Sequence, residues 1–361
     1  MMDDALRILE IMTNKGKKPD VVTYNTLLMG LCKFGKINEA VDLLKLLMTK
    51  EFHVNPDVIT FNLLIQGLCK EGRLRDANKI HSTMLERGFS GNIFTYNILI
   101  EGYLKLGNVF KAMELWKHMV DLGFLPDSTT YSVMINGLCK MQILNIAKGL
   151  FIKRLASGTR PSVTDYNALL ASLCREGSLD QARGLFEEMR NVNHGPDVVS
   201  FNTIINGTLK AGDHFSAKQL LLDMTKMHLT PDANTFSILI NWSSKLGQMD
   251  DAESLLERMI ACGLTPDAFV YDSLLKGYGS RRNTEKVVHL LHQMADKGVV
   301  LDSEITSTIL ICLCRSSRDL DIAKVLPDFS RETSKGTSIT CNELLMKLNK
   351  AHPELQFFAA S

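Results

Sequence analysis

The sequence has no long hydrophobic run, no large excess of either charge and no arginine-rich leader segment. No stretch approaches the roughly 20 uninterrupted apolar residues of a membrane-spanning helix, so the sequence predicts no membrane partner. The chain has 41 basic and 40 acidic residues and a formal net charge of +1. This balance argues against a protein that binds polyanions through bulk charge, although it leaves room for a basic stripe on one surface.

Metal and disulfide signatures are also missing, although the chain has 8 cysteines. No C-x-x-C occurs, Cys312-x-Cys314 has no histidine at ligand spacing, and the H-x-E and P-C-x-x-C signature of zinc deaminases is absent. We therefore predict no metal, no other cofactor and no small-molecule substrate. Four cysteines that share one position of a repeat are expected to be small buried hydrophobes: Cys32, Cys69, Cys139 and Cys174.

What the sequence contains is a period of about 35 residues. The same segment recurs as VVTYNTLLMGLCKFGKINEA from Val21, VITFNLLIQGLCKEGRLRDA from Val58 and VVSFNTIINGTLKAGDHFSA from Val198. In the last of these, apolar residues recur at helical spacings on both sides of Gly212, where a first helix would end in a left-handed cap, and Pro231 closes the repeat. Each repeat is therefore predicted to be a hairpin of two short helices. The expected fold is an all-α solenoid, a superhelix of stacked hairpins.

Two columns of residues fit stacked hairpins and are expected to be buried. The second helix carries a small residue where backbones would approach closely: Ala40, Ala77, Ala112, Ala147, Ala182, Ala217 and Ala252. The first helix carries an aromatic residue, which we interpret as core and not as a stacking platform: Tyr24, Phe61, Tyr96, Tyr131, Tyr166, Phe201, Phe236 and Tyr271.

The period predicts the domain organisation. Residues 1–20 match only the second helix of a truncated repeat. Eight full repeats follow, at 21–57, 58–92, 93–127, 128–162, 163–197, 198–232, 233–267 and 268–302. Residues 303–337 form a degenerate ninth, in which Pro327 should break or kink the second helix, and 338–361 are expected to be a capping helix and tail. Because the chain opens halfway through a hairpin, we expect a fragment that lacks its N-terminal cap and targeting sequence.

The repeat, V-T-Y-N-T-L-L-x-G-L-C-K-x-G closing with M-x-x-x-G-x-x-P-D, closely resembles the pentatricopeptide repeat of plant organelle proteins. The resemblance covers nearly the whole chain, and the W-x-x-L-G-x-x-Y pattern of the related tetratricopeptide repeat is not found. The uniform repeat length resembles the P class, which lacks an editing deaminase. The resemblance implies that each repeat reads one base of a single-stranded RNA through a few side chains, with the protein running parallel to the RNA.

The resemblance also implies which residues select the base, namely the fifth and the last of each repeat. An asparagine amide can match the edge of a pyrimidine, a neighbouring aspartate can fix its orientation, and a shorter serine leaves room for a purine. The implied bases are U for Asn with Asp, C or U for Asn with Asn, G for Ser with Asp and, as an open assignment, A for Ser with Ser. The pairs are Asn25 with Asp57, Asn62 with Asn92, Asn97 with Asp127, Ser132 with Ser162, Asn167 with Asp197, Asn202 with Asp232, and Ser237 with Asp267. The expected site is about 5′-U-(C/U)-U-A-U-U-G-3′.

The selector asparagines have an alternative interpretation, because asparagine near a helix start can be an N-cap. Here it lies well inside the apolar run, where its helix propensity is poor, and this favours base reading. The eighth repeat pairs Asp272 with Asp302. Two carboxylates are expected to repel an RNA backbone, so we expect this repeat to read poorly.

Two further columns point to the same ligand. A basic residue near the end of the first helix would form a ladder of phosphate contacts, although cations also favour helix C-termini through the macrodipole: Lys33, Lys70, Lys105, Lys140, Arg175, Lys210 and Lys245. By resemblance, the second residue of each repeat sandwiches the base, with inter-repeat packing as the alternative: Val22, Ile59, Phe94, Thr129, Thr164, Val199 and Asn234.

The leading hypothesis is a sequence-specific RNA binder with no enzymatic chemistry. It would act in organellar RNA processing, such as stabilisation, splicing, end maturation or translation, with RNA-processing proteins as further partners. The expected location is the mitochondrion, with the chloroplast as the alternative. The rival is a protein-binding α-solenoid adaptor, but a peptide groove has no reason to alternate Asn/Asp with Ser/Asp. An RNA endonuclease is less well supported, because no cluster of aspartates lies outside the repeat frame.

Overall fold

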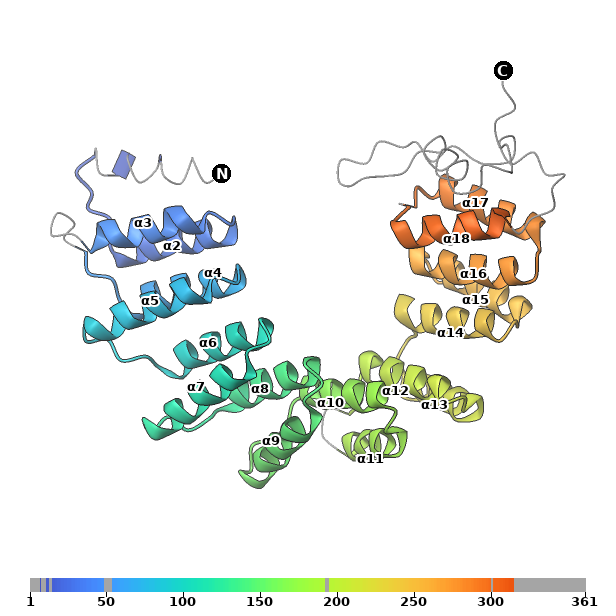
Figure 1. The fold of residues 1–361 in the computed structure, drawn as a ribbon, viewed down its shortest axis with the longest axis horizontal. Coiled ribbons are helices and arrows are strands. Elements are labelled where there is room, and N and C mark those ends of the chain that lie inside the picture. Colours follow the sequence, from blue (N-terminus) through green and yellow to red (C-terminus); the bar gives the residue numbers. More distant parts are fainter. Residues whose placement is uncertain are drawn as a thin grey trace, which may run out of the picture. The chain divides into compact units, whose positions relative to one another are not determined.

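The computed structural model describes residues 7, 11–12, 15–48, 54–191, 195–299 and 301–314. These residues form α-helices joined by turns, with no strand among them, and the helices alternate as first and second members of hairpins (Figure 1). The first helices are α2 (Val21–Lys33), α4 (Val58–Lys70), α6 (Ile93–Lys105), α8 (Ser128–Lys140), α10 (Val163–Glu176), α12 (Val198–Lys210), α14 (Ala233–Lys245), α16 (Ala268–Ser280) and α18 (Ser303–Cys314). The second helices are α3 (Ile37–Leu47), α5 (Leu74–Glu86), α7 (Val109–Asp121), α9 (Leu144–Ala156), α11 (Leu179–Arg190), α13 (His214–Lys226), α15 (Met249–Ala261) and α17 (Thr284–Asp296).

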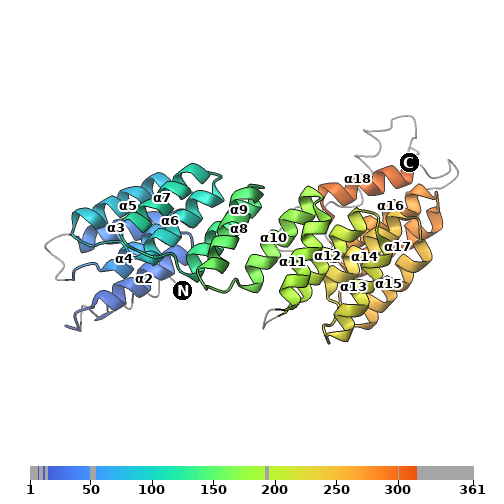
Figure 2. The same cartoon turned by 90° about the horizontal axis from the view of Figure 1, so that it is seen from below.

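The hairpins stack within two compact parts of the chain, an N-terminal part, Met1–Pro196, and a C-terminal part, Asp197–Ser361. In the N-terminal part α2, α4, α6, α8 and α10 pack on one another in succession, and in the C-terminal part α12, α14, α16 and α18 do the same. Figure 2 shows the same succession of hairpins in each part from below. The prediction of an all-α array of stacked hairpins is confirmed. Each first helix begins at the first residue of an expected repeat.

The core lies between the two helices of each hairpin and between neighbouring hairpins. Every aromatic residue of the first-helix column is at most 5% exposed, and every alanine of the second-helix column at most 3%. Both columns are therefore core, as the sequence predicts. Small side chains in the second helix let the backbones approach, and the aromatic rings fill the space that remains.

Side-chain caps set the start of the first helices. The carboxylate of Asp57 accepts a hydrogen bond from the backbone N–H of Thr60 at 2.8 Å, which satisfies a donor that the helix itself leaves unpaired. The same cap precedes the other first helices up to α16: Asp20, Asn92, Asp127, Ser162, Asp197, Asp232 and Asp267. The first helix α12 ends as predicted, because Gly212 follows its last turn in the left-handed conformation with φ +80°.

Close packing between repeats depends on Gly102 in α6. A Cβ at this position would lie 2.8 Å from Sγ of Cys69 and 3.0 Å from Cδ2 of Leu74. We expect Gly102→Ala to lower the free energy of unfolding by about 1–3 kcal/mol, as overpacking does, although alanine has the better helix propensity by about 1 kcal/mol.

The control for this prediction is Gly149→Ala in α9, where a Cβ would meet nothing within 4 Å. This variant should raise the free energy of unfolding by up to about 1 kcal/mol through helix propensity alone. Urea unfolding followed by circular dichroism measures both variants. Equal effects at the two positions would contradict the role of the close approach at Gly102.

Three expectations fall wholly or largely outside the described residues. They are the truncated repeat at residues 1–20, of which the structure describes residues 7, 11–12 and 15–20, the kink at Pro327 in the ninth repeat, and the capping helix and tail at 338–361.

Candidate nucleic-acid interface

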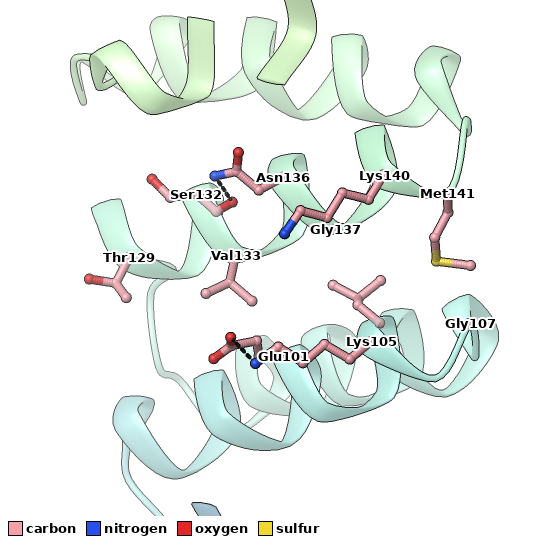
Figure 3. Close-up of a pocket in the computed structure, with 11 residues that line it drawn as sticks. Glu101, Lys105, Gly107, Thr129, Ser132, Val133, Asn136, Gly137, Lys140 and Met141 are labelled. Carbon is pink, nitrogen blue, oxygen red and sulfur yellow. Dashed lines mark hydrogen bonds and ion pairs between the residues drawn. The ribbon is translucent and has the colours of Figure 1, made fainter. Parts of the chain in front are cut away.

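A groove between α6 and α8 brings the three predicted columns together (Figure 3). Its volume is about 550 Å³, and its lining includes Ser132 from the selector column and Thr129 from the sandwich column. Lys105 and Lys140 from the basic column lie on the same groove, one from each helix. A ligand in this groove could therefore contact a selector, a sandwich residue and two lysines at once.

In the first repeat the selector pair is joined by a third residue that sequence reasoning missed. Nδ2 of Asn25 donates to Oδ1 of Asp57 at 3.2 Å. The buried hydroxyl of Thr60 lies 2.7 Å from Oδ1 of Asn25 and 2.8 Å from Oδ1 of Asp57. Because Asp57 holds the amide nitrogen and Thr60 the amide oxygen, the orientation of Asn25 is fixed. One N–H and one carbonyl lone pair of Asn25 remain for a ligand.

The same arrangement recurs in the C-terminal part of the chain, in the sixth repeat. Nδ2 of Asn202 donates to Oδ1 of Asp232 at 3.0 Å, and the hydroxyl of Thr235 donates to Oδ1 of Asn202 at 2.7 Å. Asn202 is only 7% exposed and Thr235 is fully enclosed. The selector amide is thus held by an aspartate and a threonine in both parts of the chain, at Asn25 in the N-terminal part and at Asn202 in the C-terminal part.

The second and third repeats are variants of this arrangement. The hydroxyl of Thr95 donates to Oδ1 of Asn62 at 2.8 Å, while Asn92 stands where most other repeats have aspartate. Asn97 hydrogen-bonds to Asp127, and its Oδ1 is buried without a partner among the described residues. An unpaired buried carbonyl is costly, so a ligand that donates to Asn97 would remove this cost.

The aspartates of these pairs are held in their ionised form. Burial alone would raise the pKa of Asp57, but hydrogen bonds from the backbone and side chain of Thr60 and from Asn25 hold that pKa below its usual value. The pKa values of Asp127 and Asp232 are lowered against burial in the same way. At neutral pH these side chains therefore act only as acceptors, which is what an asparagine amide requires.

The N-cap interpretation belongs to the other member of each pair. The selector asparagines lie inside the first helices, one turn after the start, so they are not caps. The last residue of each repeat is the cap of the next first helix, as Asp57 is of α4. The sequence carried a signal for this, because Asp57 stands directly before the apolar run, where an N-cap is expected, and in the structure Asp57 and Thr60 form a reciprocal capping box.

The remaining selector pairs differ from this arrangement. In the fourth repeat Oγ of Ser132 accepts a hydrogen bond from Nη1 of Arg154 at 3.1 Å. In the seventh, Oγ of Ser237 donates to the backbone carbonyl of Ala233 at 2.7 Å, while Asp267 caps α16. In the fifth, Asn167 is half-buried in the N-terminal part, whereas Asp197 caps α12 in the C-terminal part.

In the eighth repeat one of the two carboxylates expected to repel RNA is paired within the protein. Asp272 is 6% exposed and is not a free carboxylate, because Nζ of Lys276 lies 2.6 Å from its Oδ2 and the hydroxyl of Thr308 donates to its Oδ1 at 2.6 Å. The ion pair offsets the charge of Asp272, while Asp302 caps α18 as a second carboxylate and Glu304 shares the same lysine at 3.3 Å. We still predict that this repeat selects a base poorly, because both carboxylate oxygens of Asp272 are already bonded to other side chains.

The predicted sandwich residues are exposed. Val22, Ile59, Phe94 and Val199 have between 54% and 64% of their surface in contact with solvent, and Thr129, Thr164 and Asn234 are exposed as well. Inter-repeat packing therefore does not account for this column. The exposed apolar side chains of the first, second, third and sixth repeats provide a surface for the face of a base, but base sandwiching stays a prediction.

The residues of the basic column are all exposed and lie in the last turn of their first helices. This position suits both phosphate contact and interaction with the helix dipole, so the two interpretations stay open. Lys105 forms an ion pair with Glu101 at 2.7 Å, Arg175 donates to the backbone carbonyl of Cys139 at 3.3 Å, and Nζ of Lys245 lies 4.8 Å from the ring of Trp242. These three cations are partly engaged within the protein.

Three cysteines of the repeat column have thiols whose pKa is raised by burial. Burial raises the pKa of Cys69 and Cys139 to about 12 and that of Cys32 to about 11, so these thiols are protonated. The described part of the chain contains no group of three or more potential metal ligands. Nor does any helix within that part have the length and hydropathy needed to cross a bilayer.

Comparisons with known proteins identify the repeat. Models of the "PPR repeat family" match residues 56–105, 91–140 and 196–245, and "PPR repeat" models match 15–46, 129–153, 157–190, 234–264 and 269–299. A search of curated proteins finds no match.

Solved structures of pentatricopeptide repeat proteins are similar in fold. The protein PPR10 in complex with an 18-nt psaJ RNA element matches 87% of this chain at 24% identity, with a TM-score of 0.72. PPR10 from maize matches 98% of this chain at 21% identity, with a TM-score of 0.58. This chain spans slightly under half of each, 46% and 47%. At these identities the likeness shows the fold alone.

Proposed function

We propose that the chain, which belongs to the pentatricopeptide repeat family, binds single-stranded RNA and reads one base with each repeat. The observation that carries the proposal is the fixed asparagine amide of the first and sixth repeats, held by an aspartate and a buried threonine. The free N–H of such an amide matches O4 of uracil, and its free carbonyl lone pair matches N3–H of the same base. This complementarity supports U as the base for an Asn with Asp pair.

The proposed site is about 5′-U-(C/U)-U-A-U-U-G-3′, read by the first seven repeats in order. Binding would act by covering the RNA or remodelling its structure, because we infer that the chain has no chemistry of its own. Stabilisation, splicing, end maturation and translation of an organellar transcript are the processes that such coverage serves. The mitochondrion is the proposed location and the chloroplast the alternative.

Fluorescence anisotropy with a labelled 5′-UCUAUUG-3′ RNA at fixed salt tests the proposal. A scrambled RNA of equal composition is the control, and circular dichroism confirms that the protein is folded. Tighter binding to the ordered site would support base reading and its direction. Equal binding would leave only the basic column as a source of affinity. The absence of binding by folded protein would favour the protein-binding solenoid.

Lys140→Ala is expected to weaken binding to every RNA sequence alike, because a phosphate contact carries no sequence information. The slope of log K against log salt should fall in magnitude by about 0.7, the value for one contact on a single strand. Lys140 suits this test better than Lys105, whose charge is paired with Glu101. Anisotropy titrations between about 50 and 200 mM salt cover the range in which such slopes are measured.

The matched control is Lys153→Ala, which removes a lysine from the last turn of the second helix α9. This variant should leave the salt dependence unchanged, since Lys153 does not line the groove of Ser132. If Lys140→Ala also left the slope unchanged, Lys140 would not contact a phosphate, and its role would be the interaction of its charge with the dipole of α8.

A further inference from the structure

The fourth repeat departs from two columns at once. At one position of the second helix, the other repeats from the second to the eighth carry a buried methionine: Met84, Met119, Met189, Met224, Met259 and Met294. The fourth repeat has Arg154 there. Three residues after the cap, most first helices carry a hydroxyl, as at Thr60 and Thr235, whereas the helix that follows the fourth repeat has Asp165.

These two departures meet in space. Nη1 of Arg154, on α9, forms an ion pair with Oδ2 of Asp165, on α10, and both residues are at most 1% exposed. Nη2 of Arg154 donates to the backbone carbonyl of Arg160 at 3.0 Å. Nη1 also donates to Oγ of Ser132, the selector of this repeat, at 3.1 Å.

Packing alone does not require this ion pair. Burying two opposite charges has a large desolvation cost, and an apolar replacement is often neutral or stabilising. Within this chain methionine and threonine fill the same two places in other repeats. Nε of Arg154 and Oδ1 of Asp165 are buried with no hydrogen-bond partner among the described residues, so the pair is also incompletely satisfied.

The contacts set the direction in which the two serines of this repeat can hydrogen-bond. Oγ of Ser132 accepts from Arg154, and the described residues contain no acceptor bonded to that hydroxyl, so its proton is available to a base in the groove. Ser162 donates its own proton to Oδ2 of Asp165 at 2.6 Å. Its oxygen accepts from the backbone N–H of Asp165 at 3.3 Å and lies 2.7 Å from the exposed hydroxyl of Thr164. When that hydroxyl turns to solvent, one lone pair of Ser162 is left to accept from a base. The repeat presents one donor and one acceptor.

The seventh repeat provides the contrast within the same chain. Ser237 donates its proton to the backbone carbonyl of Ala233, so its oxygen can only accept from a base. Its partner Asp267 is a carboxylate side chain, which when ionised also only accepts. Two acceptors match the N1–H and N2–H groups of guanine. A serine selector thus has opposite polarity in the fourth and seventh repeats, and Arg154 is the residue that distinguishes them.

We infer that Arg154 is a positioning residue for base selection, which makes the fourth repeat select an amino base over a keto base. Adenine and cytosine present a ring nitrogen acceptor beside an amine donor, which matches the Ser132 proton and the Ser162 oxygen. Guanine and uracil present an N–H beside a carbonyl, which is the reverse polarity. This inference rests on the proposed RNA reading and goes beyond it in naming the group that sets the polarity.

The test compares the wild-type chain with the double variant Arg154→Met/Asp165→Thr, which restores the pattern of the other repeats. Anisotropy is measured with 5′-UCUNUUG-3′ RNAs in which N is each of the four bases. For the wild type, A and C should bind about tenfold tighter than G and U, the effect of one well-placed hydrogen bond. In the double variant, whose Ser132 can turn its proton to its own helix, this ratio should fall to about twofold or less.

A second set of RNAs separates failure of the inference from failure of the proposed function. These RNAs vary the sixth base, read by Asn202 and Asp232, whose preference for U should be the same in both proteins. If the wild type prefers U at the sixth base and the double variant keeps the full amino-base preference at the fourth, Arg154 has only a structural role. A wild type with no preference at the fourth base alone overturns the inference. A wild type with none at either position overturns the proposed function as well.

Discussion

Replacing Asn202 with serine is expected to weaken binding of an RNA with U at the sixth base by roughly tenfold to a hundredfold, the discrimination of a good two-bond base contact. The substitution removes the amide that donates to Asp232 and accepts from Thr235. It also removes the N–H and the carbonyl that remain for uracil. A serine is shorter, so the preference should move toward a purine at that base. Anisotropy with four RNAs that differ only at the sixth base measures the change.

The matched control is Asn145→Ser, the same substitution at an exposed position of α9. It should change neither the affinity nor the base preference, because Asn145 lies on a second helix away from the selector column. If Asn202→Ser left the sixth-base preference unchanged, the assignment of that base to this repeat would be wrong. A uniform loss for all four bases would instead indicate damage to the fold.

Arg154→Met as a single substitution is expected to lower the free energy of unfolding by about 3–5 kcal/mol, since it leaves a buried carboxylate without its partner. Asp165 has no exposed surface through which water could replace the guanidinium. Adding Asp165→Thr should return the stability to near that of the wild type or above it, because an apolar or neutral replacement of the whole pair avoids the desolvation cost. Urea unfolding followed by circular dichroism measures all three proteins.

Arg160→Met serves as the control for this second prediction. The Arg160 side chain is exposed, and surface substitutions of this kind usually change stability by less than about 0.5 kcal/mol. Only the backbone carbonyl of Arg160 contacts Arg154, and the substitution keeps it. A single Arg154→Met variant as stable as this control would mean that the buried pair contributes nothing to the fold.

Much of the fold could be read from the sequence because a repeat multiplies each weak local signal. The position of Gly212 predicted the end of α12, and the repeated start at Val58 or Val198 coincides with the first residue of a helix. Burial of the aromatic and alanine columns followed from helical spacing alone. From a single hairpin of this length, neither the helix ends nor the buried positions could have been predicted, because several placements of two short helices would fit one copy of the pattern.

The site could be read only in part. The selector column was visible as polar residues in an apolar run, but Thr60 was overlooked because a hydroxyl near a helix start looks like ordinary capping. Asp57 directly before the apolar run was a sufficient signal for the cap, and the spacing of Glu101 and Lys105 was one for their ion pair. The contact of Arg154 with Asp165 could not be predicted from the sequence. The two residues differ from the repeat pattern on different helices, and nothing in the sequence requires such residues to face each other.

The capping role of the last residue in each repeat limits how far the target of such a protein can be changed. Each second selector must also start the next helix, so its variation is confined to side chains that can do both, and the caps of the described first helices from α4 to α16 are only Asp, Asn and Ser. Exchanging one for alanine would remove about 1 kcal/mol of helix stability as well as a recognition contact. An array retargeted at many positions should therefore keep its second selectors within this small set, and gain its new specificity mainly through the first.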